Sequence, residues 1–478
     1  MPQRIQRSAF PSRRAARTLP RALLACTLAG CASVAESSAP APAPVNPPQD
    51  PVAAQSPDPQ PSAVGGEDAR AHFTGFVSAR LLARFAGGEH DADLVGLVSV
   101  DYSDPRRAWI RAHATARLAL DLDGSSPGSP FDGLSDLYDQ ALEARLYDAY
   151  VDLEPPDGIG RLRVGRQYEA LSPETVHFDG LAFHTEPAGP SELSAGFYGG
   201  APVHLYEARE EGESLLGSFV EARPWAHARA RLDWMHLDDT ALLGPVAADL
   251  FGLGLWQRFE GGLAAEGQYT RLGDEDRDLR LRGEYQAEDG SLALRATYYQ
   301  LFQTQNELPD VIDPYSAVLQ EYFPYRQGGL SLTSELGHDV ALDLGADLRR
   351  VDDADDVGEF NRDWERYRIG LAFRDAFTRG LTLTLSADQW DGDERDIGTW
   401  GANLDYQDEG AWRYSAGSYY SLYKYDLYSN SERDDVRTYY ARAVYKVGPQ
   451  LSFELGYDYE DDVFEQYHIL RGGALWRF

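Results

Sequence analysis

Residues Ile110–Leu122 read IRAHATARLALDL, and this stretch decides the fold class. Its even-numbered positions are all Ile, Ala or Leu, while the odd-numbered positions between them carry Arg, His, Thr, Arg, Ala and Asp. Alternation of this kind is typical of a β-strand with one apolar face and one polar face, whereas an amphipathic helix repeats every 3.6 residues.

The same period of two recurs through most of the chain, for example in residues 73–85, 279–286 and 366–374. We count about 22 such segments after residue 71, and 18 or 20 stay possible because the segments around 200–225 are hard to separate. The connections between segments alternate between short and long. The long ones are 123–139, 236–249, 302–326, 351–364 and 423–433. This pattern predicts an all-β fold, a single antiparallel transmembrane β-barrel over residues 71–478, with short periplasmic turns and longer extracellular loops.

A soluble β-sandwich or propeller is the alternative, and the C-terminus argues against it. The chain ends LRGGALWRF (Leu470–Phe478), with apolar or small residues at every second position before the final Phe. This end resembles the C-terminal signal of bacterial outer-membrane proteins. The resemblance implies that Trp476 and Phe478 are recognised by the barrel-assembly machinery and that the barrel lies among outer-membrane lipids.

Composition excludes several other classes of protein. The 478 residues include 44 basic and 77 acidic ones, and the resulting net charge of −33 argues against nucleic-acid binding, which needs a basic surface. After residue 35 no apolar run approaches the roughly 18 residues of a membrane-spanning helix. Both cysteines, Cys26 and Cys31, lie near the N-terminus, so a disulfide scaffold or a cysteine-based zinc site in the barrel is not expected.

The N-terminus has the features of a targeting segment followed by a spacer. Residues 1–30 combine six arginines with a short apolar run, which predicts a secretory signal peptide. Its end, Leu28-Ala29-Gly30-Cys31, resembles a bacterial lipobox, which implies lipidation of Cys31; cleavage after Ala35 is the alternative. Residues 31–70 are rich in proline and predict a disordered periplasmic linker.

Arginines dominate the polar face of the predicted strands, although the whole chain is acidic. An unpaired charge that faced lipid would cost about 2–4 kcal/mol at the membrane midplane, so these arginines are expected to line the lumen. They either brace the interior by pairing with acids or form a ladder that guides anionic or polyhydroxylated solutes. The predicted lumen-lining residues are Arg80, Arg84, Arg111, Arg117, Arg161, Arg163, Arg229, Arg231, Arg280, Arg282, Arg295, Arg366, Arg368, Arg442 and Arg471.

Motifs for catalysis, cofactor binding or metal binding are not found, so we expect neither an enzyme nor a cofactor. His177 and Asp179 share one face of a predicted strand, and a hydrogen bond inside the lumen is favoured over acid–base chemistry. Asp388, Asp391, Asp393 and Asp396 have a loosely calcium-like spacing but lack a full ligand set, which favours a solvated loop.

Two segments resemble known channels. Leu162–Gln167 (LRVGRQ) followed by Phe178–Leu181 (FDGL) is similar to a strand pair of Gram-negative porins and, more loosely, of alginate-export barrels. The resemblance implies a porin-like outer-membrane channel for hydrophilic solutes. An exopolysaccharide-export barrel with periplasmic partners and a non-conducting envelope scaffold are the alternatives. Residues 302–326 are the candidate for a constriction or plug.

Overall fold

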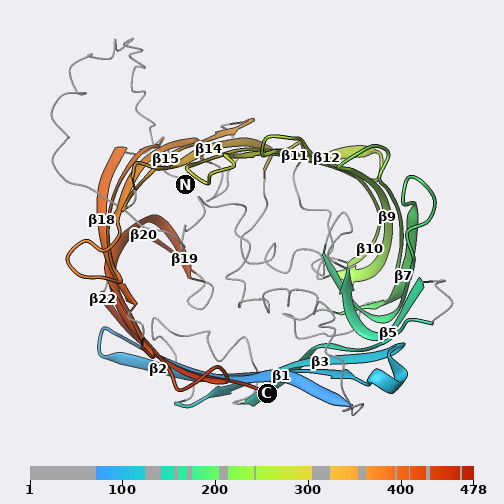
Figure 1. The fold of residues 1–478 in the computed structure, drawn as a ribbon, viewed down its shortest axis with the longest axis horizontal. Coiled ribbons are helices and arrows are strands. Elements are labelled where there is room, and N and C mark those ends of the chain that lie inside the picture. Colours follow the sequence, from blue (N-terminus) through green and yellow to red (C-terminus); the bar gives the residue numbers. More distant parts are fainter. Residues whose placement is uncertain are drawn as a thin grey trace, which may run out of the picture.

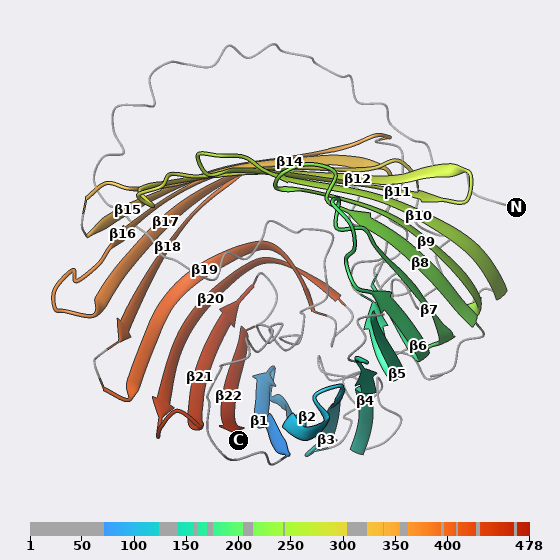
Figure 2. The ribbon, with the colours of Figure 1, turned by 45° about the vertical axis from the view of Figure 1, so that its right-hand side comes forward.

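A computed structural model shows one sheet of 22 strands that closes on itself (Figures 1 and 2). It describes residues 71–123, 142–155, 160–169, 175–203, 214–241, 244–303, 323–337, 339–353, 362–392, 396–407, 410–426, 431–462 and 466–478. The predicted signal peptide, the linker and Cys31 lie outside the described residues and stay predictions. Residues 304–322, which make up most of the candidate plug, also lie outside the described residues.

The strands follow one another around the ring in chain order. They are β1 (His72–Ala86), β2 (Glu89–Ser103), β3 (Ile110–Asp121), β4 (Leu142–Leu153), β5 (Gly160–Glu169), β6 (Val176–Thr185), β7 (Ser194–Pro202), β8 (Ser214–Ala222), β9 (Ala228–Ala241), β10 (Gly244–Arg258), β11 (Leu263–Leu272), β12 (Glu275–Gln286), β13 (Leu292–Leu301), β14 (Tyr325–Glu335), β15 (Val340–Val351), β16 (Trp364–Phe373), β17 (Leu381–Gly392), β18 (Asp396–Gln407), β19 (Trp412–Asp426), β20 (Ser431–Lys446), β21 (Leu451–Asp461) and β22 (Gln466–Arg477). In the described part of the chain the helical content is one 3-10 turn, Pro105–Arg107, and no helix there has the length and hydropathy to cross a membrane.

Every strand pairs antiparallel with the next, and β22 pairs with β1 to complete the ring. At this seam the register runs from Phe76 opposite Arg477 to Phe85 opposite His468. Phe478 extends the seam by one residue, because its backbone N–H and C=O exchange hydrogen bonds of 3.1 Å with Gly75. The predicted barrel and its count of about 22 strands are confirmed, and the ring closes by pairing of the last strand with the first.

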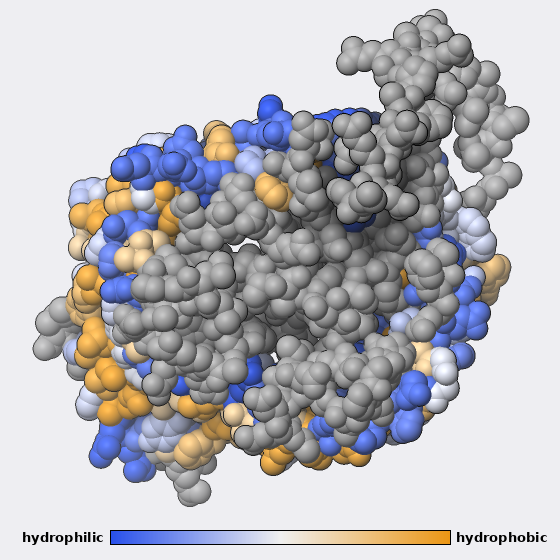
Figure 3. All heavy atoms as spheres, turned by 180° about the vertical axis from the view of Figure 1, so that it is seen from behind, coloured by the Kyte–Doolittle hydropathy of each residue, from blue (hydrophilic) through white to orange (hydrophobic). Residues whose placement is uncertain are grey.

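The outer surface carries the apolar face of each strand. Leu81, Leu118, Leu253 and Leu455 are among the exposed apolar side chains, the last with 64% of its surface accessible. Apolar patches follow the margin of the barrel in the space-filling view (Figure 3). An apolar outer face with paired backbone groups is what a sheet needs to lie in lipid.

Aromatic rings gather at the strand ends of this outer face. Near the end where the chain terminates, the rings of Trp412 and Tyr445 lie 4.5 Å apart, and those of Trp476 and Phe478 lie 5.1 Å apart. Trp476 is 49% exposed. Aromatic rings are favoured at membrane–water interfaces, so these residues mark one boundary of the apolar belt.

The two rims of the barrel differ in their connections. At the rim that holds both ends of the barrel, which we call the short-turn rim, the connections are four to eight residues long. At the opposite, long-loop rim they range from two residues to the 23 between β13 and β14. The predicted long loops at 236–249 and 423–433 are wrong. β9 and β10 extend through the first to a two-residue connection, and β19 and β20 extend into the second and leave four residues between them. Beyond the membrane a strand no longer needs an apolar face, so polar residues there do not end the pairing.

Deletion of Phe478 is expected to lower assembly more than stability. It removes two seam hydrogen bonds, which are worth about 0.5–1.5 kcal/mol each, whereas the resemblance to the assembly signal predicts a large loss of folded protein in the membrane. The heat-resistant band on gels measures the amount of folded protein in the membrane, and urea unfolding measures the free energy of unfolding of that protein. Phe478→Tyr, which keeps the ring and both backbone bonds, is the control. A normal membrane level of the truncated chain would contradict the signal.

Candidate functional site: the interior wall

The interior of the barrel contains a cavity of about 2350 Å³ that is lined by residues of β10 to β21 and by Thr175. Eight arginines line it: Arg258, Arg280, Arg282, Arg295, Arg366, Arg368, Arg413 and Arg442. Nine carboxylates line it as well: Glu266, Glu284, Glu288, Asp289, Asp343, Asp347, Asp388, Asp405 and Glu454. The wall of this cavity is therefore mixed in charge, without an excess of arginine.

Ion pairs between neighbouring strands organise the wall of the cavity. Arg366 on β16 donates to Asp388 on β17 at 2.8 Å, and Arg368 lies 3.3 Å from Asp347 on β15. These pairs form because alternation places the side chains of adjacent strands on the same face, where a long side chain reaches its diagonal neighbour: Arg366 is opposite Trp390 and Arg368 is opposite Gly345. The positive and negative side chains thus neutralise one another locally.

A three-membered group shows the same principle on β12 and β13. Glu284 accepts hydrogen bonds from Arg282 at 2.6 Å and from Arg295 at 2.7 Å. On β20 to β22, Asp458 lies between Arg471 at 2.8 Å and Arg442 at 3.9 Å. One carboxylate therefore serves two arginines, and at least one arginine of each group, Arg295 or Arg442, also lines the cavity.

The arginines outside the cavity lining also lie on the face opposite the exposed apolar side chains. Arg84 on β1 is buried and lies 3.3 Å from Asp91 and 3.1 Å from Asp93 on β2. Arg80 shares this face of β1, opposite the exposed Leu81. Along β1 the arginines thus alternate with the exposed apolar side chains.

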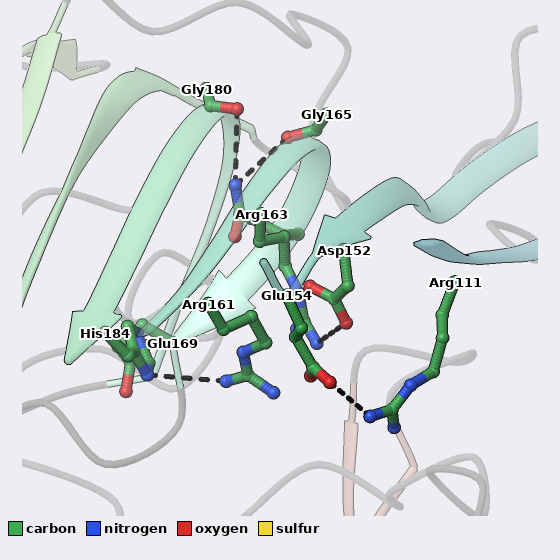
Figure 4. A network of polar contacts seen from close by, with 10 residues as sticks. Arg111, Asp152, Glu154, Arg161, Arg163, Gly165, Glu169, Gly180 and His184 are labelled. Carbon is green, nitrogen blue, oxygen red and sulfur yellow. Dashed lines mark hydrogen bonds and ion pairs between the residues drawn. The ribbon is translucent and has the colours of Figure 1, made fainter. Parts of the chain in front are cut away.

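Arginines of β3 to β5 join a network of polar contacts (Figure 4). Arg163 makes two hydrogen bonds with Asp152 at 2.8 and 2.9 Å and stacks 3.7 Å above the Tyr150 ring. Arg111 is paired with Glu154. The two other predicted residues of this region are Arg117, which is buried on β3, and Arg161, which approaches His184.

On β9, Arg229 lines a second cavity of about 840 Å³ at the short-turn rim, and Arg231 lies two residues further along the same face of the strand. Arg229 lies 2.8 Å from Glu221 and 4.4 Å from the Trp256 ring. Arg231 is only 2% exposed and lies 2.8 Å from Asp233. It also stacks 3.8 Å from the Phe219 ring. Arg231 is thus the most deeply buried of the predicted arginines whose partners are described.

The turn Ala287–Ser291 places a fixed negative charge at the mouth of the larger cavity. Asp289 accepts hydrogen bonds from the hydroxyl and the backbone N–H of Ser291 at 2.7 and 3.0 Å. These bonds lower the pKa of the Asp289 carboxyl from its ordinary value. The Asp289 carboxylate therefore stays ionised to a lower pH than an ordinary aspartate does.

The hairpin of β5 and β6 departs from the straight strands that the sequence predicts. Arg161 Nη2 lies 3.3 Å from His184 Nδ1, and Glu169 Oε2 lies 3.5 Å from His184 Nε2. Arg161 and Glu169 are eight residues apart on one strand, which would separate them by about 26 Å if the strand were straight. Since both reach the same imidazole ring, the strand must fold back between them. All three side chains lie on the inner face, so the fold is toward the lumen.

Glycines make this fold possible. Gly165 lies midway between Arg161 and Glu169, has a φ of +127°, and is paired with Gly180, which is paired with Gly200 on β7. A Cβ atom on Gly165 or Gly180 would lie 2.2 or 2.1 Å from a backbone oxygen of the adjacent strand. Only glycine permits this approach. Figure 4 shows the ribbon bending over at both residues.

The segments beyond the bend, residues 166–169 and 175–179, form what we call the inturned hairpin. Its Val176 and Phe178 are fully buried in a cluster with apolar residues of the inner wall. The other buried members of this cluster are Ala182, Tyr198, Leu215, Met235, Leu237 and Leu250. Burial of a side chain of this size contributes about 1.5–3 kcal/mol, so apolar packing is the main force that holds the inturned hairpin.

Two candidate sites from the sequence are separated by the structure. Asp179 is held by two hydrogen bonds from Arg166 at 2.8 Å, while His177 packs 5.4 Å from the Tyr168 ring, so the two are directed to different partners. Asp388 points to Arg366 in the lumen, and within β17 the odd-numbered Asp391 belongs to the opposite face. Among the described residues, no group of three potential metal ligands is found.

Solved structures with the same architecture exist at very low sequence identity. The P pilus usher (PapC) translocation pore matches with a TM-score of 0.51 and 8% identity, over 85% of this chain and 99% of the pore. OpdK from Pseudomonas aeruginosa, solved with vanillate, matches with a TM-score of 0.43 and 12% identity, over 85% of this chain and 98% of OpdK. A BenF-like porin from Pseudomonas fluorescens matches with a TM-score of 0.42 and 11% identity, over 86% of this chain and 100% of the porin.

At these identities the likeness shows the fold alone, and only the first score exceeds 0.5. No protein-family model and no curated protein matches the sequence. A closed barrel with an apolar outer belt is the form in which sheets cross outer membranes. The chain is therefore a β-barrel of a Gram-negative outer membrane.

Replacement of Arg231 by methionine is expected to lower the free energy of unfolding by about 3–5 kcal/mol, because it leaves buried carboxylates without their cation. Arg295→Met is the matched control. Arg295 is 57% exposed, and its partner Glu284 keeps Arg282, so the expected loss is at most about 1 kcal/mol. Urea unfolding of the folded barrel measures both. Equal losses would show that burial does not govern the strength of these pairs.

Proposed function

We propose that this barrel is a passive outer-membrane channel for small hydrophilic solutes. The observation that carries the proposal is the cavity inside the closed ring, whose wall is built from charged and polar side chains while the outer face is apolar. Water and polar solutes are stabilised by such a wall, and the ring separates them from lipid.

The charge of the wall defines the class of solute. Arg295 on β13 pairs with Glu284 on β12. The two arginines of β16 pair with Asp388 on β17 and Asp347 on β15, so each charge is neutralised from an adjacent strand. Interactions between solvent-exposed charges are screened beyond about 8–10 Å, so a solute meets alternating fields and not one sign. Neutral polar solutes and small ions of either sign fit this wall better than a strictly anionic cargo does.

The preference for anions is therefore expected to be weaker than the strand sequences alone suggest. The arginines of the predicted ladder are present, but the described lining has nine carboxylates against eight arginines and so carries no net positive charge. Polysaccharide export and a scaffold role stay alternatives, and no contact among the described residues favours either.

Planar-bilayer recordings of the wild-type protein are expected to show pores with a reversal potential near zero in a KCl gradient. The double variant Arg366→Gln, Arg368→Gln should shift selectivity toward cations, because Asp388 and Asp347 lose their partners. Arg326→Gln with Arg374→Gln is the matched control, since both of these arginines lie outside the cavity lining and pair with Asp352 and Glu335.

Two results would count against the proposal. A complete absence of pores would favour the scaffold role. A strongly ion-selective pore that the Arg366 and Arg368 changes leave unaltered would mean that this wall does not contact the permeating solute.

A further inference from the structure

We propose that the outer face of β18 to β22, near the long-loop rim, binds the headgroup of a phosphorylated glycolipid of the outer leaflet, with Arg437 as the residue that holds the phosphate. The site lies on the lipid-facing side of the wall, and the cavity lies on the other side. The proposal is therefore independent of whether the barrel conducts.

Ring-bearing side chains form a row across this part of the outer face. Tyr439 on β20 is directly opposite Tyr459 on β21, and Tyr459 is opposite His468 on β22. Beyond the seam, His468 is opposite Phe85 on β1. The ring centroids of Tyr439 and Tyr459 lie 6.1 Å apart, and those of Tyr459 and His468 lie 5.2 Å apart. Figure 2 shows these four strands side by side. The row marks the boundary of the apolar belt at the long-loop rim, where aromatic rings are favoured.

Arg437 lies just beyond this boundary. It precedes Tyr439 by two residues on the same face of β20, on the side of the long-loop rim. Its guanidinium carbon lies 5.0 Å from the centre of the Trp400 ring and 5.7 Å from that of the Tyr439 ring. Trp400, on β18, is 69% exposed. Aromatic faces attract a guanidinium group, so the two rings hold this cation at the level of the lipid headgroups.

Arg437 differs from other arginines on the outer face at this rim in having no carboxylate partner among the described residues. Arg326 on β14 lies 2.8 Å from Asp352, and Arg350 on β15 is paired with Glu365. The Nη2 atom of Arg437 is buried and has no hydrogen-bond acceptor. A guanidinium group donates five hydrogen bonds, so this group has donors to spare for an anion.

The acidic residues around Arg437 are directed to other groups. Asp461 is directly opposite Arg437 in the register, but the two do not form an ion pair, and Asp461 accepts a hydrogen bond from Gln466 at 3.3 Å. Asp435, two residues before Arg437, accepts one from the Tyr420 hydroxyl. The charge of Arg437 is thus not matched by the carboxylates that are closest to it in the sheet.

A lipid with a phosphate in its headgroup meets both features of this surface. A guanidinium group matches the charge and the acceptor geometry of a phosphate. Below the row of rings, the exposed side chains of Leu455 and Leu470 provide an apolar surface for acyl chains. The long-loop rim is the extracellular end of such a barrel, so the lipid belongs to the outer leaflet, where it carries phosphates on a glucosamine disaccharide.

Titration of the full-length protein in detergent with diphosphoryl lipid A, followed by native mass spectrometry, tests the site. Arg437→Gln should lower the affinity by roughly tenfold, the loss expected for one hydrogen bond to a charged group. Arg326→Gln is the matched control, because Arg326 lies on the same face near the same rim and already has a carboxylate partner. Its affinity should equal that of the wild type.

A second pair of variants tests the ring that positions the guanidinium group. Trp400→Leu keeps the surface apolar and removes the ring, so it should lower the affinity for diphosphoryl lipid A while Arg437 is still present. Trp412→Leu is the control, since Trp412 is also exposed on the outer face but lies at the short-turn rim. The heat-resistant band on gels reports whether each variant folds, and Trp400→Leu keeps the test open if Arg437→Gln does not.

The outcomes separate this lipid from other anions. Equal affinity in the wild type, Arg437→Gln and Trp400→Leu overturns the proposal, and so does an equal loss in Arg326→Gln. Phosphatidylglycerol should bind the wild type more weakly than diphosphoryl lipid A. Equal binding of the two would show that any anionic lipid occupies this face. Displacement of lipid A by an equal concentration of inorganic phosphate would assign Arg437 to a free anion and overturn the lipid site.

Discussion

Backbone hydrogen bonding in a medium without water is the constraint on which the rest of this structure depends. An unpaired N–H or C=O in lipid costs several kcal/mol, so every strand must have a partner on both sides. The pairing of β22 with β1 gives these two strands their second partner, and the backbone bonds of Phe478 extend the pairing to the last residue. Closure with an even number of antiparallel strands also brings both ends of the barrel to one rim. Alternation then assigns every side chain to lipid or to lumen.

The chemistry of the interior follows from that assignment. A charged side chain in the spanning part of a strand has only the inner face available, so arginines and carboxylates meet there at cross-strand distances. Their pairing ranges from the exposed group around Glu284 to the nearly inaccessible Arg231. The same contacts brace the wall and neutralise it. In the proposed channel, such a wall would discriminate by size and local polarity more than by charge.

The sequence predicted those features that depend on a period of two: the strands, their alternating faces and the single closed barrel. It did not predict where β9 and β10 end, because polar residues beyond the membrane are compatible with strand and loop alike. It also did not predict the inturned hairpin. The segment around Gly165 and Gly180 resembles straight porin strands, and a pattern of alternation records which face a residue takes but not whether the strand bends. Apolar residues on the inner face, such as Phe178, Met235 and Leu237, were the available signal.

The inturned hairpin also bears on the order in which the barrel can assemble. Its contacts with β7, β8, β9 and β10 all lie within one contiguous part of the chain, from Gly160 to Arg258. The seam, in contrast, joins the two ends of the barrel, and the entropy cost of closing a loop grows with its length. The short-range contacts can therefore form while the sheet is still open. The ring then closes around a hairpin that is already packed against the wall. The apolar cluster between them need not be exposed to lipid during insertion.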